Sequence, residues 1–283
     1  MAVIASIEAR APNPYIPARL MTSASTQQPA DIRRVALVTG AADRVGAAIA
    51  KRLARAGWAV LVHYRNSAAK AETVAAQIRA DGGRAATVGA DLADRVQRAG
   101  LIAAATTPFG PLTLLVNNAS IFERDAVVDL DEALWDAHFA IHVEAPAFLS
   151  RDFAAQLPDD AAGNIVNIID ERVLDLSPAF FSYTLSKSTL WTMTRTLAQS
   201  LAPRIRVNAI APGPTVPPPH VAPEDHARRL TELPLGTSAD ADGIADGVLA
   251  ILSLPAMTGQ MIALDGGEHL EWPARRGPTP RRR

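Results

Sequence analysis

The sequence predicts an α/β fold, with one doubly wound parallel sheet of about seven strands and helices on both faces. Short apolar runs rich in β-branched residues alternate with longer alanine-rich segments, which is typical of repeated β-α-β units. Each run ends at a turn or a polar residue. The expected strands are 35–40, 59–64, 85–90, 112–119, 164–170, 206–213 and 260–267.

The segment between the first two expected strands has helical periodicity. Its apolar residues Val45, Ala48, Ile49 and Leu53 recur every three or four positions, and Gly57 ends the run. The chain has 283 residues, 48% of them hydrophobic, which is enough for one sizeable core. A single domain is therefore expected.

We place that domain at residues 33–272. Residues 1–32 are expected to form a disordered or loosely docked extension, because charges and prolines interrupt every apolar run, and Met21 is an alternative start. The basic tail 273–283 is expected to be a solvated chain end. The proline-rich stretch 212–236 follows a strand end and is either a substrate lid or a plain surface loop.

Composition and charge narrow the function classes. The chain contains no cysteine, which excludes disulfides, cysteine-ligated zinc and thiolate nucleophiles, and a reducing, cytoplasmic location fits. The formal net charge is -1 at pH 7, which gives no reason to expect a nucleic-acid or membrane partner. A small-molecule substrate is the better expectation.

The turn after the first strand is a candidate phosphate-binding site of the Rossmann type. It contains Gly40, Arg44, Val45 and Gly46 just before the first helix. Glycines allow backbone N–H groups and the helix N-terminus to approach a pyrophosphate closely. The alternative is an ordinary turn between a strand and a helix.

The end of the second strand indicates which nicotinamide cofactor binds. An acidic residue there would hydrogen-bond the ribose 2′-hydroxyl and repel a 2′-phosphate. The segment is instead His63, Tyr64, Arg65 and Asn66, and Arg44 offers a second cation nearby. NADPH is therefore favoured over NADH, unless Arg65 is simply solvated.

Tyr183 and Lys187 form the sharpest catalytic signal. They are four residues apart and therefore lie on one face of the helix that follows. An ammonium near a phenol favours the phenolate, so the pair is expected to lower the pKa of Tyr183 and let it exchange a proton.

In its motifs the chain resembles the short-chain dehydrogenase/reductase family over about residues 33–272. The shared motifs are TG with a glycine turn, NNA after the fourth strand, Y-x-x-x-K, and the PG of IAPG, in the family's order and spacing. The resemblance implies hydride transfer from a nicotinamide, with Tyr183 as the acid and Lys187 holding the nicotinamide ribose. It also implies cofactor-lining positions, namely Asp91, Leu92, Asn117, Asn118, Ala119, Pro212 and Gly213.

Asp170 departs from the family pattern. It stands thirteen residues before Tyr183, where most members have a serine that donates a hydrogen bond to a substrate carbonyl. An ionised carboxylate only accepts hydrogen bonds, so Asp170 suits a substrate with N–H donors or one that needs a relayed proton. The alternative is a strand-end residue without chemistry.

Three departures together resemble the pteridine reductases and dihydromonapterin reductases: Arg44 at the usual middle glycine, NNA continuing as NNASIF, and Asp170. That resemblance implies that Phe122 stacks a pterin ring against the nicotinamide. Arg44 and Ser120 would bond the pterin edge, and Asp170 would act with Tyr183 in proton delivery. For Phe122 the alternative is routine core packing.

His138 and His142 are four residues apart on an expected helix, but no further ligand accompanies them, so no metal site is expected. His142 falls where many members of the family have an asparagine that helps link the lysine to solvent. A histidine there could relay protons or could simply be packed.

The apolar helix expected from Tyr183 to Leu201 must be buried against another surface. The family resemblance implies a homo-oligomer, a dimer or tetramer, built on this helix; a buried monomer core is the alternative.

The sequence thus predicts an NADPH-dependent reductase that converts a dihydropterin to a tetrahydropterin. One rival is a carbonyl or 3-oxoacyl reductase, which Asp170 disfavours because a ketone oxygen needs a donor. Another is a catalytically silent NADP-binding regulator, which the intact Tyr183 and Lys187 disfavour.

Overall fold

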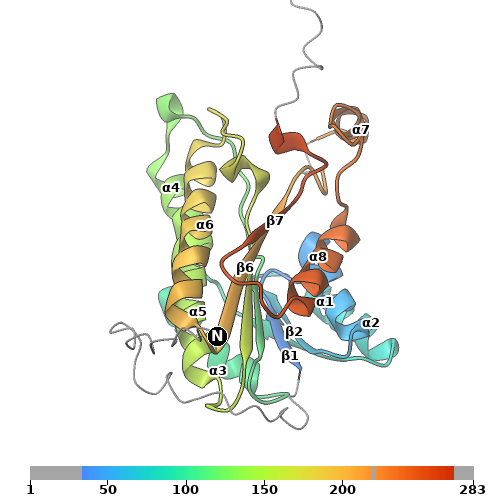
Figure 1. Ribbon diagram of the computed structural model, residues 1–283, viewed down its shortest axis with the longest axis vertical. Coiled ribbons are helices and arrows are strands. Elements are labelled where there is room, and N and C mark those ends of the chain that lie inside the picture. Colours follow the sequence, from blue (N-terminus) through green and yellow to red (C-terminus); the bar gives the residue numbers. More distant parts are fainter. Residues whose placement is uncertain (1–33, 218–220, 271–283) are drawn as a thin grey trace, which may run out of the picture.

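The computed structural model describes residues 34–217 and 221–270 and contains one sheet of seven parallel strands in the order β3-β2-β1-β4-β5-β6-β7 (Figure 1). This confirms the predicted fold. The strands are β1 (Val35–Val38), β2 (Ala59–Tyr64), β3 (Arg84–Gly89), β4 (Leu114–Asn117), β5 (Gly163–Ile168), β6 (Ile205–Pro212) and β7 (Met261–Leu264). The expected extension 1–32 and tail 273–283 lie outside the described residues.

Helices cover both faces of the sheet, as Figure 1 shows. On one face lie α1 (Arg44–Arg55), α2 (Ala68–Ala80) and α8 (Ala241–Ser253). The other face carries α3 (Arg95–Thr106), α4 (Glu132–Phe139), the π-helical turn η3 (Ala140–Glu144), α5 (Ala145–Gln156) and α6 (Phe181–Leu201). Shorter elements are η2 (Val127–Asp129), η4 (Glu171–Val173), α7 (Pro223–Thr231) and η5 (Glu268–Leu270). None of these helices is long and apolar enough to cross a membrane.

The central strands are buried on both faces, which explains why their sequences are continuously apolar. In β1, Ala36 and Val38 pack into the core beneath α1 and α8, whereas Val35 and Leu37 pack into the core beneath α3 and α5. All four side chains are fully buried.

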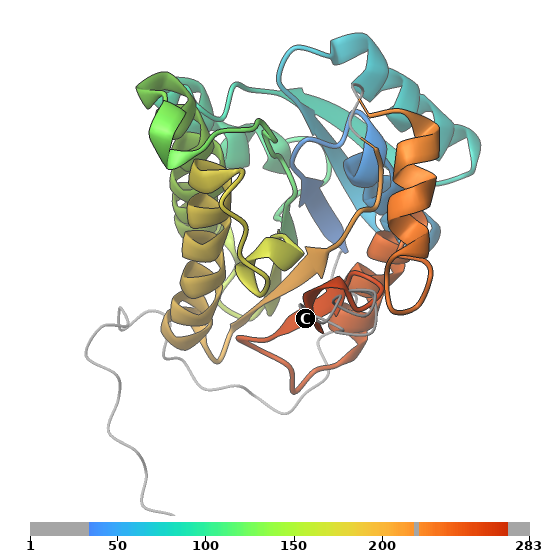
Figure 2. The same ribbon diagram turned by 90° about the horizontal axis from the view of Figure 1, so that it is seen from above.

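The carboxyl ends of all seven strands meet at one edge of the sheet, and Figure 2 looks down on that edge. The strand order reverses between β1 and β4, and ligands of open α/β sheets bind at such a point. The described parts of the stretch 212–236, residues 212–217 and 221–236, lie at this edge and contain the short helix α7, which the sequence did not predict. Its role as a lid and the dimer face expected on α6 stay predictions.

Candidate active site

The glycine turn after β1 packs directly against the end of β4. Gly40 has φ +62°, and a Cβ there would come within 2.9 Å of the Ala119 Cα. A Cβ on Gly46 would come within 2.3 Å of the Gly40 carbonyl oxygen and 2.6 Å of Asn118 Nδ2. The Thr39 hydroxyl accepts the N–H groups of Asn118 and Ala119 at 2.9 and 3.0 Å. Only glycine fits both positions, which leaves bare backbone at the start of α1.

Arg44, at the position of the family's usual middle glycine, has a backbone conformation that favours glycine. Its φ is +51°, in the left-handed region that ordinary residues seldom adopt. Its N–H donates to the Asp43 carboxylate at 2.8 Å, and its guanidinium donates to the Val216 carbonyl at 2.7 Å. The guanidinium therefore lies between the glycine turn and the segment after β6. The next residue, Val45, is half-buried on α1.

Both ring nitrogens of His63 form hydrogen bonds within the protein. Nδ1 accepts the Gly40 N–H at 3.0 Å, so Nε2 carries the proton and donates to the Ala90 carbonyl at 3.1 Å. Burial lowers the pKa of His63 to about 4. The neighbouring Arg65 and Asn66 are exposed at the carboxyl edge, and Tyr64 is half-buried.

The remaining expected cofactor residues also lie at this edge. Asp91 accepts the Ala93 N–H at 2.9 Å, and Leu92 is buried. Asn117 is buried and donates to Asn167 at 2.8 Å. Pro212 ends β6, and a Cβ on Gly213 would come within 2.7 Å of the Asp265 Cα. Their contacts with a cofactor stay predictions.

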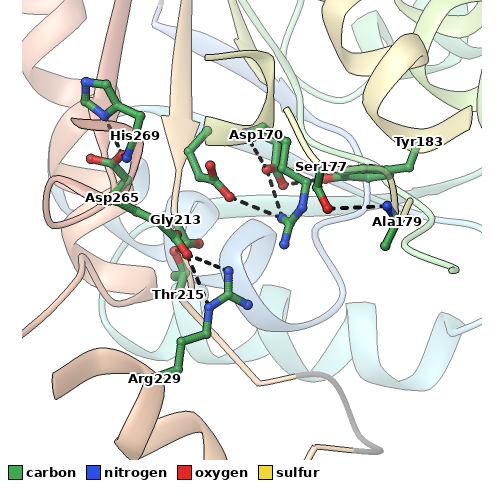
Figure 3. A network of polar contacts seen from close by, with 12 residues as sticks. Asp170, Ser177, Ala179, Tyr183, Gly213, Thr215, Arg229, Asp265 and His269 are labelled. Atoms are coloured by element: carbon green, nitrogen blue, oxygen red, sulfur yellow. Dashed lines mark hydrogen bonds and ion pairs between the residues drawn. The ribbon is translucent and has the colours of Figure 1, made fainter. Parts of the chain in front are cut away.

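The structure brings Asp170 and Tyr183 together, as the dashed line in Figure 3 marks. The phenol donates to Asp170 Oδ2 at 2.7 Å, from the first turn of α6 to the end of β5. Lys187 is buried one turn further along α6, and its ammonium donates to the Ile168 carbonyl at 2.9 Å. The three residues named as catalytic therefore form one cluster.

The expected direction of the Tyr183 pKa is wrong. Burial, followed by the Asp170 carboxylate, raises the pKa of Tyr183 well above its ordinary value. A phenol that donates to a carboxylate loses that bond and gains a repulsive charge when it ionises. Burial also lowers the pKa of Lys187 to about 8, which weakens its hold on a phenolate. The arrangement keeps the proton on Tyr183, as a proton donor requires.

Arg172 and Glu171 surround Asp170. Arg172 donates to Asp170 Oδ1 through its backbone N–H at 3.0 Å and its guanidinium at 3.2 Å, and it pairs with Glu171 at 3.3 Å. Burial, with added repulsion from Asp170 and Glu268, raises the pKa of Glu171 to about 8. Glu268 in turn pairs with Arg229 of α7 at 2.7 Å, which extends the network to the loop after β6 (Figure 3).

Phe122 lies beside Tyr183 in an aromatic group. Its ring stacks on Phe180 with centroids 4.4 Å apart and meets the Tyr183 ring edge-on at 4.9 Å. The Arg172 guanidinium is 5.4 Å from the Phe122 centroid and 5.1 Å from that of Phe180. Phe180 has φ +60°, an unusual conformation for an aromatic residue. Arg172 and Phe180 could not be predicted from the sequence, because neither belongs to a motif and only the fold brings them to Phe122.

Ser120, the last expected substrate residue, is bound to a histidine. Its hydroxyl lies 2.9 Å from Nε2 of His142, which is buried. His138 and His142 stack with centroids 5.6 Å apart. Among residues 34–217 and 221–270, no three His, Cys, Asp or Glu side chains are grouped to hold a metal.

Comparison with known proteins decides the family. The family model described as short chain dehydrogenase matches residues 34–227. The chain belongs to the short-chain dehydrogenase/reductase family. It is thus an oxidoreductase. It is 38% identical to an uncharacterized oxidoreductase of Methylorubrum extorquens over 243 residues, 83% of this chain and 97% of the relative.

Other members of the family are similar to this chain. A 3-oxoacyl-[acyl-carrier-protein] reductase, FabG, of Staphylococcus aureus is 32% identical over 240 residues, 83% of this chain and 98% of the relative. Among solved structures, FolM alternative dihydrofolate reductase 1 from Brucella suis, in complex with NADP, has a TM-score of 0.82 and 50% sequence identity. That match covers 87% of this chain and 96% of the other. Within the family the chain is therefore similar to the pteridine and folate reductases.

Proposed function

We propose that this oxidoreductase reduces an unsaturated pterin with NADPH, converting a dihydropterin to its tetrahydro form. The observation that carries the proposal is the hydrogen bond from Tyr183 to Asp170 Oδ2 at 2.7 Å. Asp170 stands where a ketone reductase of this family has a donor serine. A carboxylate that already accepts the Tyr183 proton offers a ketone oxygen no second donor.

The residues present fit NADPH. Gly40 and Gly46 let the turn pack tightly against the end of β4, and the N-terminus of α1 that follows favours an anion such as a pyrophosphate. Arg65 is exposed at the end of β2, where an acidic residue would repel a 2′-phosphate. The NADP complex of the Brucella suis protein, at 50% identity, supports the same cofactor.

Bound NADPH would supply the hydride to a ring carbon of the pterin. The raised pKa of Tyr183 keeps its proton in place until the adjacent ring nitrogen becomes basic. Tyr183 then donates that proton, so that a C=N bond becomes CH–NH. Asp170 orients the phenol and can accept an N–H from the amino edge of the pterin.

Phe122 would support the flat pterin ring. Phe122 stacks on Phe180, meets Tyr183 edge-on and is only partly buried. A flat heteroaromatic ring stacks well on such a surface. Ser120 and Arg44 lie at the carboxyl edge of the sheet, where they can bond the polar edge of the ring.

The test is NADPH oxidation by the purified protein with a 7,8-dihydropterin, a panel of small ketones and a 3-oxoacyl thioester. The pterin is expected to be the preferred substrate. Tyr183→Phe removes the acid and should lower kcat by roughly 10²–10⁴-fold. Asp170→Ser should lower pterin turnover by about 10²-fold and improve ketone turnover, because serine restores a donor.

The 32% identity to the Staphylococcus aureus FabG makes a 3-oxoacyl substrate the competing outcome. Preference for a ketone or thioester, with Asp170→Ser as active as the wild type, would overturn the pterin assignment and leave the family and cofactor untouched. Intact NADPH binding without turnover of any of these compounds would also contradict the proposal.

A further inference from the structure

His142 lies in an irregular turn behind the catalytic tyrosine. The π-helical turn η3 separates α4 from α5, and single π-helical turns often occur at functional sites. The turn buries His142 completely between the segment after β4 and helix α6. Its ring meets the Tyr183 ring edge-on, with centroids 5.3 Å apart.

Both ring nitrogens of His142 have partners, and the partners fix its tautomer. Nε2 accepts the Ile121 N–H at 3.2 Å and lies 2.9 Å from the Ser120 hydroxyl, so Nε2 carries no proton. Nδ1 lies 2.8 Å from the Ser186 hydroxyl. That hydroxyl donates its own proton to the Tyr183 carbonyl at 2.7 Å, so Ser186 must accept from Nδ1–H.

We infer that His142 is a positioning residue that fastens the substrate segment Ser120–Phe122 to the catalytic helix α6. One arm, through Nε2, holds the segment at Ser120 and Ile121. The other arm, through Nδ1, holds the first turns of α6 at Ser186. The ring thereby sets the position of Phe122 relative to the Tyr183 phenol. We call the contacts of His142 with Ser120, Ile121 and Ser186 the clamp. The identity of the substrate that the clamp helps to position rests on the proposed function, but the clamp itself does not.

The clamp requires a neutral imidazole, because a proton on Nε2 would remove the acceptor for Ser120 and Ile121. Burial, with repulsion from Lys187 and His138, holds the pKa of His142 well below its ordinary value. A neutral ring with its proton on Nδ1 agrees with the geometry of all its contacts.

His138 provides a matched control one turn earlier. It is equally buried, and its Nδ1 lies 2.7 Å from the Ser182 hydroxyl. Its ring is 5.8 Å from that of Tyr183. Its Nε2, however, has no hydrogen-bond partner within the described part of the chain. His138 thus shares the packing of His142 without its contact to the substrate segment.

Two amide substitutions separate the two arms. Asparagine places its amide where Nδ1 lies, so His142→Asn keeps the Ser186 contact and loses the contacts of Nε2. Glutamine reaches the position of Nε2, so His142→Gln keeps an acceptor for Ser120 and Ile121. The readouts are kcat and KM for whichever substrate the wild type reduces best, with thermal melting as a measure of folding.

We expect His142→Asn to raise the substrate KM about ten-fold while kcat stays within about three-fold, because loop order and not proton transfer is lost. His142→Gln should keep KM within about three-fold of the wild-type value. His138→Asn should do the same, even if its melting temperature falls as much as that of His142→Asn. An unchanged KM in His142→Asn, or equal increases in His142→Asn and His138→Asn, would overturn the inference.

A second measurement needs neither substrate nor a folded variant. Nitrogen-15 NMR of the wild-type protein should show His142 neutral between pH 6 and 8, with its proton on Nδ1. A proton on Nε2, or a histidinium at pH 7, would overturn the clamp. Because a failed pterin assay leaves this result unaffected, the two proposals fail separately.

Discussion

The two halves of the site are built by different means. In the half formed by β1, β2 and β3, the close contacts involve backbone, as where the Gly40 N–H donates to His63 and a Cβ on Gly46 would strike the Gly40 carbonyl. In the half formed by β4, β5 and α6, the central contact joins two side chains, the Tyr183 phenol and the Asp170 carboxylate. The first is the expected cofactor half and the second the expected substrate half.

The difference shows where specificity can reside. Backbone N–H groups at a helix N-terminus recognise a phosphate whatever the substrate is. The side chains at the ends of β4 and β5 can change without disturbing the strands, which is how one fold carries many chemistries. Substitutions of the turn glycines in the cofactor half should therefore act through steric clash, and substitutions in the substrate half through charge and proton balance.

Gly46→Ala should produce the largest effect. Its Cβ would meet the Gly40 carbonyl at 2.3 Å and Asn118 at 2.6 Å, so the turn must shift away from the end of β4. We expect NADPH affinity to fall by more than about 100-fold and unfolding free energy to fall by roughly 1–3 kcal/mol. Fluorescence titration with NADPH and denaturant unfolding measure the two quantities.

Gly100→Ala is the control for that experiment. Gly100 lies within α3, and a Cβ there meets nothing within 4 Å. Alanine should stabilise the helix by roughly 0.5–1 kcal/mol and leave NADPH binding unchanged. If both variants bind NADPH as tightly as the wild type, the cofactor half does not depend on the bare glycine backbone.

The same contrast explains what the sequence could predict. The strands were predictable, because a strand buried on both faces reads as a continuous apolar run, as 59–64 does. The motif residues Asp170, Tyr183 and Lys187 were also found, and the structure gathers them into one cluster. Helix α7 was missed because the stretch is proline-rich, although Pro223 occupies the first turn, where its missing N–H is harmless.

What could not be predicted depends on three-dimensional neighbours. The sequence indicated that Lys187 lowers the pKa of Tyr183. Burial and the Asp170 carboxylate have the larger effect, and they raise that pKa instead. Likewise, nothing in the spacing indicates that Phe180 stacks on Phe122, because a chain reversal between β5 and α6 creates the contact.

Glu171→Gln should make the unfolding free energy less dependent on pH, because it removes a buried carboxyl group whose ionisation at higher pH destabilises the substrate half. Burial beside Asp170 and Glu268 raises the pKa of Glu171 to about 8 from 4.5, so the folded state holds a proton that the unfolded state releases. The stabilisation is fully present below pH 4.5 and is lost as pH rises toward 8. We expect the wild type to lose on the order of 5 kcal/mol from this group across that range, at about 1.4 kcal/mol for each pH unit.

Denaturant unfolding at pH 5 and pH 8.5 tests the prediction, with exposed Glu232→Gln as the control. Glu171→Gln should narrow the difference in unfolding free energy between the two pH values, and Glu232→Gln should not. The cofactor half has the opposite dependence: the lowered pKa of His63, about 4 against 6.5, costs stability as pH falls through that range. If the unfolding free energy changes with pH equally in the wild type and in Glu171→Gln, then Glu171 is ionised in the folded protein and the prediction is wrong.

Arg65→Glu should give the smallest effect, because it changes one exposed side chain and no packing. A carboxylate at the end of β2 repels a 2′-phosphate and accepts a hydrogen bond from a 2′-hydroxyl. The ratio of kcat/KM for NADPH to that for NADH should fall about ten-fold. Arg55→Glu, at the opposite end of α1, carries the same charge change and should leave the ratio unaltered. A ratio unchanged by Arg65→Glu would assign the 2′-phosphate to Arg44, so that cofactor choice also resides in the glycine turn and the cofactor half is less generic than its backbone suggests.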